Sequence, residues 1–379
     1  MSSRDVSSAA YLDFAATTPV DGRVADLVLR LMREDFANAG SRTHEEGVMA
    51  AREVTKARER VAAELASAPE EVIFTSGATE GSNLAILGLA RAAGRRQHIV
   101  TTSIEHSAVQ GPIDALESEG FEVTRVRPDH LGRVAVEDVI GAVRADTMLV
   151  SIMHANNETG AVQPIAAIAD GLPAGPAYHV DAAQTFGRLS SELHHPRIDL
   201  ASVSGHKIYA PKGVGALMVR LGPGRPVISP IMHGGGQERG LRPGTVPVPL
   251  VAGLGLASEL AGLEREMRAA RCAAIRDDAL RALLPLGAVV HGRDGPSLPH
   301  ILGVAFPGVD SEALMVALRG TASISNGSAC TSSHYRPSHV LQAMALSEDL
   351  VRGTVRFSWS HDIAPPPWGE IAAVVRMLS

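Results

Sequence analysis

Short apolar runs alternate with longer amphipathic stretches along most of the chain. The apolar runs predict β-strands, at residues 71–74, 98–102, 121–126, 147–153, 178–184, 199–203, 213–219 and 355–358. Stretches with apolar residues on one helical face predict helices, at residues 20–36, 44–66, 136–143 and 248–284 and from residue 79 onward. This alternation is typical of an α/β fold built on a mostly parallel sheet.

Polar side chains follow five of the predicted strands, at Thr79, His106, Asn156, Asp181 and Lys207. In open α/β sheets, ligands bind where strands end at their carboxyl side. Several chemically active side chains that converge on one edge indicate a catalytic or binding site more strongly than a scaffold. We therefore expect these five residues to lie together at one edge of the sheet.

Lys207 is the main candidate for chemistry that needs an amine. The chain has only three lysines, Lys56, Lys207 and Lys212. Lys56 lies in a charged helical stretch, residues 51–60, where an ordinary solvated lysine is expected. Lys207 instead follows the strand at residues 199–203, although taken alone it is also compatible with a loop lysine.

Asp181 and Gln184 add to the case for Lys207. A lysine that forms an imine with pyridoxal phosphate needs a carboxylate that keeps the pyridine nitrogen protonated, and a donor near the phenolic oxygen. Asp181 and Gln184 fit these two roles, because an apolar run delivers both of them toward the same edge of the sheet. Together the three residues predict a site for pyridoxal phosphate.

A glycine-bearing turn at residues 75–78, Thr-Ser-Gly-Ala, joins a predicted strand to a predicted helix. Backbone N–H groups at the positive end of a helix suit a phosphate. A tight turn with Thr79 near the helix cap explains the same residues equally well. The turn lacks the Gly-Lys-Ser/Thr ending of a Walker loop.

Composition narrows the remaining classes. With 379 residues, of which 45% are hydrophobic, the chain can form two domains or one large domain with an appendage. A net charge of −6 provides no basic field for nucleic acid, so no direct nucleic-acid binding is predicted. Two cysteines and a polar N-terminal segment favour a reducing, cytoplasmic location. No apolar run reaches the roughly 18 residues of a membrane span, and no metal site is predicted.

Two motifs resemble those of the class V aminotransferase family of pyridoxal-phosphate enzymes, and specifically of the cysteine desulfurases. They are His-Val-Asp-Ala-Ala-Gln at residues 179–184 and Ser-Gly-His-Lys at residues 204–207. The similarity runs from about Tyr11 to about Ser360. It implies a fold-type I transferase with a mostly parallel sheet in a large cofactor-binding domain, residues 15–260. A smaller α+β domain would combine residues 1–14 and 261–379.

The resemblance also implies a cofactor site assembled from many segments, with Ala78, Thr79, His106, Asn156, Asp181, Gln184, Ser204, His206 and Lys207. Ala78 and Thr79 would bind the phosphate. His106 would stack on the pyridine ring and move protons. Asn156 would lie beside the phenolic oxygen and the substrate carboxylate.

Two further residues concern the substrate and the partner subunit. The resemblance implies that Arg356 holds the carboxylate of an amino-acid substrate through its guanidinium, with a structural salt bridge as the ordinary alternative. Thr245 is implied to touch the phosphate bound by the neighbouring subunit, so an obligate homodimer is expected.

Cys330 is the candidate sulfur carrier. It lies in a run of small polar residues, 325–334, whose composition predicts a mobile loop. An unprotected thiol is open to oxidation, which argues against an incidental cysteine. The residues Ser-Ala-Cys-Thr-Ser around it resemble the desulfurases with a long catalytic loop. Cys272 lies in the predicted helix at residues 248–284, where we expect a structural role.

The implied reaction converts L-cysteine to L-alanine. Lys207 would remove the α-proton, Asp181 would hold the pyridinium that takes up the electrons, and the Cys330 thiolate would attack the substrate sulfur to give an enzyme persulfide. A transaminase or lyase on the same fold would need Lys207 and Asp181 but not Cys330. A non-enzymatic interaction module would need none of the three.

The sequence carries no motif for the sulfur acceptor. In relatives a longer C-terminal tail helps to dock the acceptor, whereas here three prolines at residues 365–367 precede an end at Ser379. Iron–sulfur cluster assembly, tRNA thiolation and DNA phosphorothioation all draw on desulfurases of the long-loop type. The shorter tail puts an iron–sulfur scaffold partner in doubt and keeps a specialised acceptor, such as the DNA-sulfur pathway, open.

Overall fold

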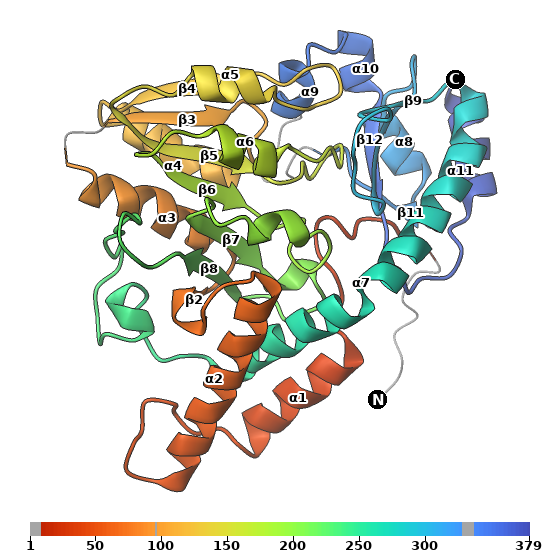
Figure 1. The fold of residues 1–379 in the computed structure, drawn as a ribbon. Coiled ribbons are helices and arrows are strands. Elements are labelled where there is room, and N and C mark those ends of the chain that lie inside the picture. Colours follow the sequence, from red (N-terminus) through yellow and green to blue (C-terminus); the bar gives the residue numbers. More distant parts are fainter. Residues whose placement is uncertain (1–8, 95–96, 328–336) are drawn as a thin grey trace.

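The computed structural model describes residues 9–94, 97–327 and 337–379, and its larger part is built on a seven-stranded sheet (Figure 1). Across the sheet the strands are β2 (Val72–Thr75), β8 (Gly215–Val219), β7 (Leu200–Ser204), β6 (Ala177–Asp181), β5 (Thr147–Met153), β3 (His98–Thr102) and β4 (Glu122–Val126). Neighbouring strands pair in parallel except around β8, which is antiparallel to both β2 and β7. The predicted α/β fold with a mostly parallel sheet is confirmed.

Helices cover both faces of this sheet (Figure 1). They include α3 (Ala78–Ala92) and α4 (Ser107–Ser118) in one hydrophobic core, and α5 (Val136–Gly141) and α6 (Ile165–Gly171) in the other. Successive strand residues point to opposite faces, so Ile99 packs in the first core while Val100 packs in the second. Burial on both faces explains why these strands form continuous apolar runs in the sequence.

Beside the sheet, α1 (Gly22–Arg33) and α2 (Glu45–Glu64) both pack against α7 (Val248–Leu283). α7 has 36 residues, which at 1.5 Å per residue makes it about 54 Å long. It approaches α2 closely at Gly255, where a Cβ atom would lie 2.5 Å from the Cα of Ala57. Across the described ranges, no helix is long and apolar enough to cross a membrane.

The C-terminal part has a smaller core of its own. Its antiparallel sheet has the order β12 (Thr354–Ser358), β10 (Ile301–Ala305), β9 (Val289–Val290), and this part also contains helices α8 (Ser311–Ala317), α10 (Glu348–Arg352) and α11 (Trp368–Leu378). Helix α9 (His339–Ala343) packs instead against Ile104 and Met153 of the larger part. The N-terminal strand β1 (Ala10–Tyr11) pairs in parallel with β11 (Ala322–Ser323), and Leu12 packs in the same core as Phe357 and Trp359. A smaller α+β part is therefore present, while the domain limits at residues 14 and 260 stay a prediction.

Candidate active site

The parallel strands bring the predicted polar residues to one edge of the seven-stranded sheet. β2, β3, β5, β6 and β7 run in the same direction, and the segments that follow their carboxyl ends carry Thr79, His106, Asn156, Asp181 and Lys207. We call this edge the carboxyl edge. Asp181, His106 and Lys207 are close enough for the charge of each to affect the pKa of another.

Lys207 ends a short 3-10 helix, Gly205–Lys207, directly after β7. Its Nζ donates hydrogen bonds to the main-chain oxygens of Ala15, at 2.5 Å, and Ala16, at 2.8 Å. The pKa of Lys207 is lowered to about 8, first by burial and then by the positive charges of Arg356 and Arg188, against smaller raising effects of Asp13 and Asp181. The amine is therefore far more often uncharged near neutral pH than an ordinary lysine.

Asp181 is the last residue of β6 and is 5% exposed. Burial raises the pKa of its carboxyl, while the N–H of Ala183, which donates to Oδ1 at 2.9 Å, and the charges of His106 and Lys207 lower it. Gln184 is also buried, and its Nε2 donates to the Ala15 oxygen at 3.1 Å. Gln184 and Lys207 therefore meet at the same main-chain oxygen.

His106 caps the N-terminus of α4, with Nδ1 accepting the N–H of Ala108 at 3.1 Å. This contact leaves Nε2 to carry the proton of the neutral ring. Partial removal from water lowers the pKa of His106. The charge of Asp181 raises it, while those of Lys207, His339 and Arg356 lower it further.

The turn between β2 and α3 forms a glycine-lined cradle. Gly77 has φ of 156° and ψ of −179°, a region essentially limited to glycine. No side chain among the described residues caps α3, and a Cβ atom on Gly77 would lie 3.7 Å from the Oγ of Ser204. In this chain Ala78 is buried and Thr79 is exposed. An uncapped N-terminus beside a serine hydroxyl is an arrangement that suits a phosphate.

His206 precedes Lys207 and contacts the segment after β1. Its Nδ1 lies 3.2 Å from the Oγ1 of Thr17, and its main-chain oxygen accepts a hydrogen bond from the Oγ1 of Thr18 at 3.0 Å. Burial lowers the pKa of His206 to about 4, with the charges of Lys207 and Lys212 adding to the effect. His206 is therefore neutral at physiological pH.

Asn156 is fully buried and stabilises the loop after β5. Its Oδ1 accepts the N–H groups of Glu158, at 2.9 Å, and Thr159, at 3.0 Å, and its Nδ2 donates to the oxygen of Ile104 at 3.2 Å. These contacts are those of an asparagine that holds a turn, here residues 156–159.

Arg356 reaches the site from β12 in the C-terminal part. Its Nη2 lies 2.6 Å from the Oδ1 of Asp13, its Nη1 donates to the oxygen of Asn157 at 2.8 Å, and its buried Nε has no hydrogen-bond partner in the described segments. The salt bridge that was the alternative role for Arg356 is therefore present, with Asp13 as its partner. The Nε–H group of the guanidinium remains a donor without a partner among the described residues.

The remaining predicted residues lie apart from this group or outside the described ranges. Thr245 is exposed in this single chain, in the segment before α7, so its contact with a neighbouring subunit stays a prediction. Cys330 lies outside the described residues. Cys272 is buried in α7, and burial raises the pKa of its thiol to about 11.

Two residues of the site received no role from the sequence. Asp13 pairs with Arg356. The one feature of the sequence that could have drawn attention to Asp13 is a charged residue between two apolar ones, Leu12 and Phe14, which are both buried. Glu105 is fully buried, and its Oε1 accepts the Thr102 hydroxyl and the Met153 N–H. Burial raises the pKa of Glu105 to about 8, and the charge of Asp181 also raises it.

The chemical groups that these residues provide match those that pyridoxal phosphate requires. Lys207 offers an amine with a lowered pKa, Asp181 offers a buried carboxylate, and residues 77–79 offer an uncapped helix N-terminus. These are the three groups that an aldehyde, a pyridine nitrogen and a phosphate require. No group of three or more His, Cys, Asp or Glu that could hold a metal ion occurs within the described ranges.

Comparison with known families assigns the chain to a class of proteins. The model of the aminotransferase class V family matches residues 10–363. The chain therefore belongs to the class V aminotransferases, which are pyridoxal-phosphate enzymes.

Individual relatives narrow this assignment. The cysteine desulfurase IscS of Anaeromyxobacter dehalogenans (strain 2CP-C) is 45% identical over 92% of this chain and 86% of the relative. That of Klebsiella pneumoniae (strain 342) is 45% identical over 92% of this chain and 87% of the relative. Within its family, the chain thus groups with the cysteine desulfurases.

Solved structures agree with this grouping. DndA from Streptomyces lividans is 47% identical, with a TM-score of 0.80 over 93% of this chain and 99% of that chain. A NifS-like protein is 36% identical, with a TM-score of 0.88 over 98% of both chains. SspA, solved in complex with cysteine, is 36% identical, with a TM-score of 0.80 over 94% of this chain and 99% of that chain.

Proposed function

We propose that this protein is a pyridoxal-phosphate-dependent cysteine desulfurase that converts L-cysteine to L-alanine and carries the sulfur as a persulfide on Cys330. The observation that carries the proposal is the convergence of Lys207, Asp181 and His106 at the carboxyl edge. The cysteine desulfurases among its relatives support the choice of substrate.

Lys207 acts as the anchoring amine and as the base. The bound cofactor supplies an electron sink for the substrate Cα–H bond. With a pKa of about 8, roughly one Lys207 amine in ten is uncharged at pH 7, against fewer than about one in a thousand for an ordinary lysine. Asp181 holds a positive charge on the pyridine nitrogen, and His106 carries a movable proton at Nε2.

Arg356 and Asn156 position the substrate. The Nε–H group of Arg356 has no partner among the described residues, so it can donate a hydrogen bond to a substrate carboxylate while Arg356 stays paired with Asp13. The Asn156 side chain keeps residues 156–159 in place through its own backbone contacts.

Cys330 takes the sulfur. Its thiolate attacks the substrate sulfur, an S–S bond forms, and the C–S bond breaks with its electron pair left on the carbon framework. Protonation of that carbon, and return of the proton that Lys207 removed from the substrate Cα, then yield alanine, and the persulfide keeps the sulfur for transfer to an acceptor.

Two variants test the proposal. We expect Lys207→Ala to lose both the cofactor absorbance and sulfide release, whereas Cys330→Ser should bind cofactor and cysteine but release no sulfide. Lys212→Ala and Cys272→Ser are the matched controls and should retain activity. If Cys330→Ser kept full cysteine turnover, a transaminase or lyase would replace the desulfurase.

The partners are part of the same proposal. We expect a homodimer in which Thr245 reaches the phosphate site of the other subunit, a cytoplasmic location, and an acceptor in iron–sulfur cluster assembly, tRNA thiolation or DNA phosphorothioation. Trapping the protein that discharges a ³⁵S-labelled Cys330 persulfide identifies the acceptor. A Thr245→Ala variant that retained wild-type cofactor affinity would contradict the contact between subunits.

A further inference from the structure

A cavity of about 170 Å³ lies next to the main chain of Lys207. Its walls come from the loop after β6, from the two residues that follow Lys207, from α7 and from residues 297–300. We call it the Arg188 cavity, because Arg188 lines it and also donates from Nη2 to the main-chain oxygen of Lys207 at 2.5 Å. Its lining includes none of the residues that are assigned to the cofactor or the substrate.

The Arg188 cavity contains polar groups that lack partners. Arg188 forms no ion pair with any described residue, and its buried Nε has no hydrogen-bond partner there. His300 is 2% exposed and lines the same cavity, and its Nε2 is likewise without a partner in the described parts of the chain. The buried Nε of Arg265, which also lines the cavity, is a third such nitrogen. Buried polar groups without partners are rare in folded proteins, so these three nitrogens suggest a missing ligand.

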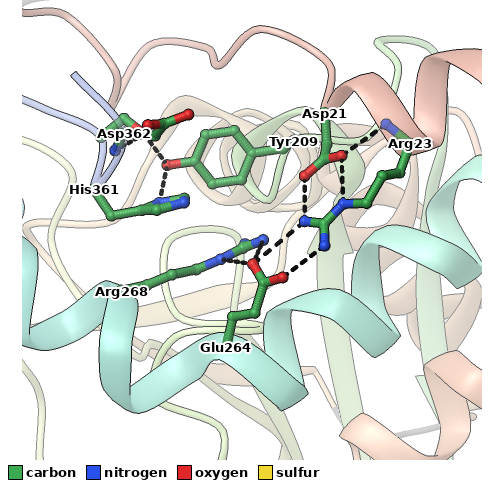
Figure 2. A network of polar contacts seen from close by, with 8 residues as sticks. Asp21, Arg23, Tyr209, Glu264, Arg268, His361 and Asp362 are labelled. Atoms are coloured by element: carbon green, nitrogen blue, oxygen red, sulfur yellow. Dashed lines mark hydrogen bonds and ion pairs between the residues drawn. The ribbon is translucent and has the colours of Figure 1, made fainter.

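Two other arginines of the cavity are already neutralised. Arg265 pairs with Glu64 at 2.5 Å. Arg268 pairs with Glu264, which also binds Arg23 (Figure 2). The cation left for a ligand is therefore Arg188.

The rest of the wall is held in place by aromatic and hydroxyl contacts. The guanidinium of Arg268 lies over the ring of Tyr209, 5.1 Å from its centroid, and the Tyr209 hydroxyl lies 3.3 Å from the Nδ1 of His361 (Figure 2). The same hydroxyl lies 2.7 Å from the Oγ of Ser360. These contacts join α7 to the segment after β12, so the cavity has fixed walls.

The remaining lining is largely apolar, with Leu189, Ile208 and Leu298 among its residues. A cavity of about 150 Å³ accommodates a ring of six carbons, so this one has room for a molecule of similar size. Its charge requirement is one negative group, because Arg188 is the one of its three arginines without an ion pair to a described residue, and burial lowers the pKa of both lining histidines, His300 and His361, and keeps them neutral. A zwitterionic amino acid would place its ammonium group near Arg188.

We propose that the Arg188 cavity binds a small organic monocarboxylate with a short apolar chain, its carboxylate on Arg188 and His300. Occupation is coupled to the active site, because Arg188 also holds the Lys207 main chain. The positive charge of Arg188 lowers the pKa of Lys207, so a bound anion raises it. This inference is independent of the proposed desulfurase reaction.

Calorimetric titration of the purified holoenzyme tests the proposal with two probes of the same shape, butanoate and its neutral amide butanamide. We expect saturable binding of butanoate that is at least about ten-fold tighter than that of butanamide, since a charge-assisted pair is lost in the amide. Arg188→Gln should remove this preference and Arg188→Lys should keep part of it. Lys212→Gln, which removes an exposed charge, should leave it unchanged.

Location is tested separately, because Arg356 can also bind a carboxylate. Butanoate should still bind Arg356→Gln. Cys330→Ser leaves Cys272 as the remaining one of the two cysteines in the chain, and Cys272 lines the cavity. Butanoate should slow its alkylation, whereas butanamide at the same concentration should not. Equal affinity for the two probes, or loss of binding in Arg356→Gln with no protection of Cys272, would overturn the proposal whether or not the protein desulfurates cysteine.

Discussion

Buried charged side chains have ion-pair partners at one edge of the seven-stranded sheet and lack them at the other. At the edge where β7 begins, buried Asp199 is paired with Arg197, at 2.5 Å, and Arg225, at 2.9 Å, and it also accepts the Tyr178 N–H at 2.9 Å. At the carboxyl edge, Asp181 and Lys207 form no ion pair with any described residue. At the first edge the buried charge is thus paired with arginines. At the carboxyl edge the charged groups remain able to bind a ligand or exchange a proton.

This difference separates stability from chemistry. Removing one partner of a buried ion pair is costly, because the other charge is left buried without compensation. An unpaired charge in a cleft has a shifted pKa, and it can exchange protons or bind a ligand, so such groups mark functional sites. Lys207 and Glu105, both with a pKa of about 8, lie at the carboxyl edge.

Substitution of Asp181 should have the largest effect on catalysis. Asp181→Asn removes the negative charge but keeps the shape, so we expect kcat/KM for cysteine to fall by about three orders of magnitude, within the range for loss of one proton-holding group. Unfolding in urea should be little changed. Full activity in Asp181→Asn would remove the carboxylate from the mechanism.

The reactivity of Lys207 should exceed that of Lys212 by on the order of a hundred-fold in cofactor-free protein at pH 8, because only the uncharged amine reacts. The uncharged fraction rises with pH through the pKa of about 8 for Lys207, whereas an exposed lysine titrates near 10.4. Mass spectrometry after brief acetylation measures both lysines in one sample. Equal labelling across pH 7–9 would show that burial does not lower the Lys207 pKa.

The contrasting edge predicts a loss of stability instead. Asp199→Asn leaves two arginines without their carboxylate, and we expect about 2–4 kcal/mol less free energy of unfolding, below the full value for a buried pair because Arg197 and Arg225 are partly exposed. Activity per folded molecule should be unchanged, which a urea titration and an assay of the same preparation determine together. A large loss of turnover without a loss of stability would remove the distinction between the edges.

The sequence predicted the sheet and the meeting of Lys207, Asp181 and His106, because strands buried on both faces leave long apolar runs and parallel strands end at one edge. It predicted less where local pattern carries no signal. Strands β1 and β11 have two residues each and pair although they lie far apart in the sequence. The apolar pattern predicts a helix at residues 20–36, whereas α1 covers Gly22–Arg33. Asp21 caps α1, and Phe36, the end of the predicted helix, is 77% exposed and lies beyond it.

The Arg356–Asp13 pair could not be predicted either, since 343 residues separate its members. This ion pair is an exception at the carboxyl edge, because Arg356 has a charged partner there. Its Nε nevertheless has no hydrogen-bond partner among the described residues.

This exception gives the smallest and most specific prediction. If Asp13 holds the guanidinium in position for the substrate carboxylate, Asp13→Asn loosens it and raises KM for cysteine by about ten-fold, the value of one charge-assisted contact, with a smaller change in kcat. Asp21→Asn, which alters an exposed pair with Arg23, is the control and should leave KM unchanged. A fall in KM would instead show that Asp13 competes with the substrate for Arg356, because removal of a competing carboxylate frees the guanidinium. The direction of the change therefore distinguishes a positioning residue from an internal substitute for the substrate.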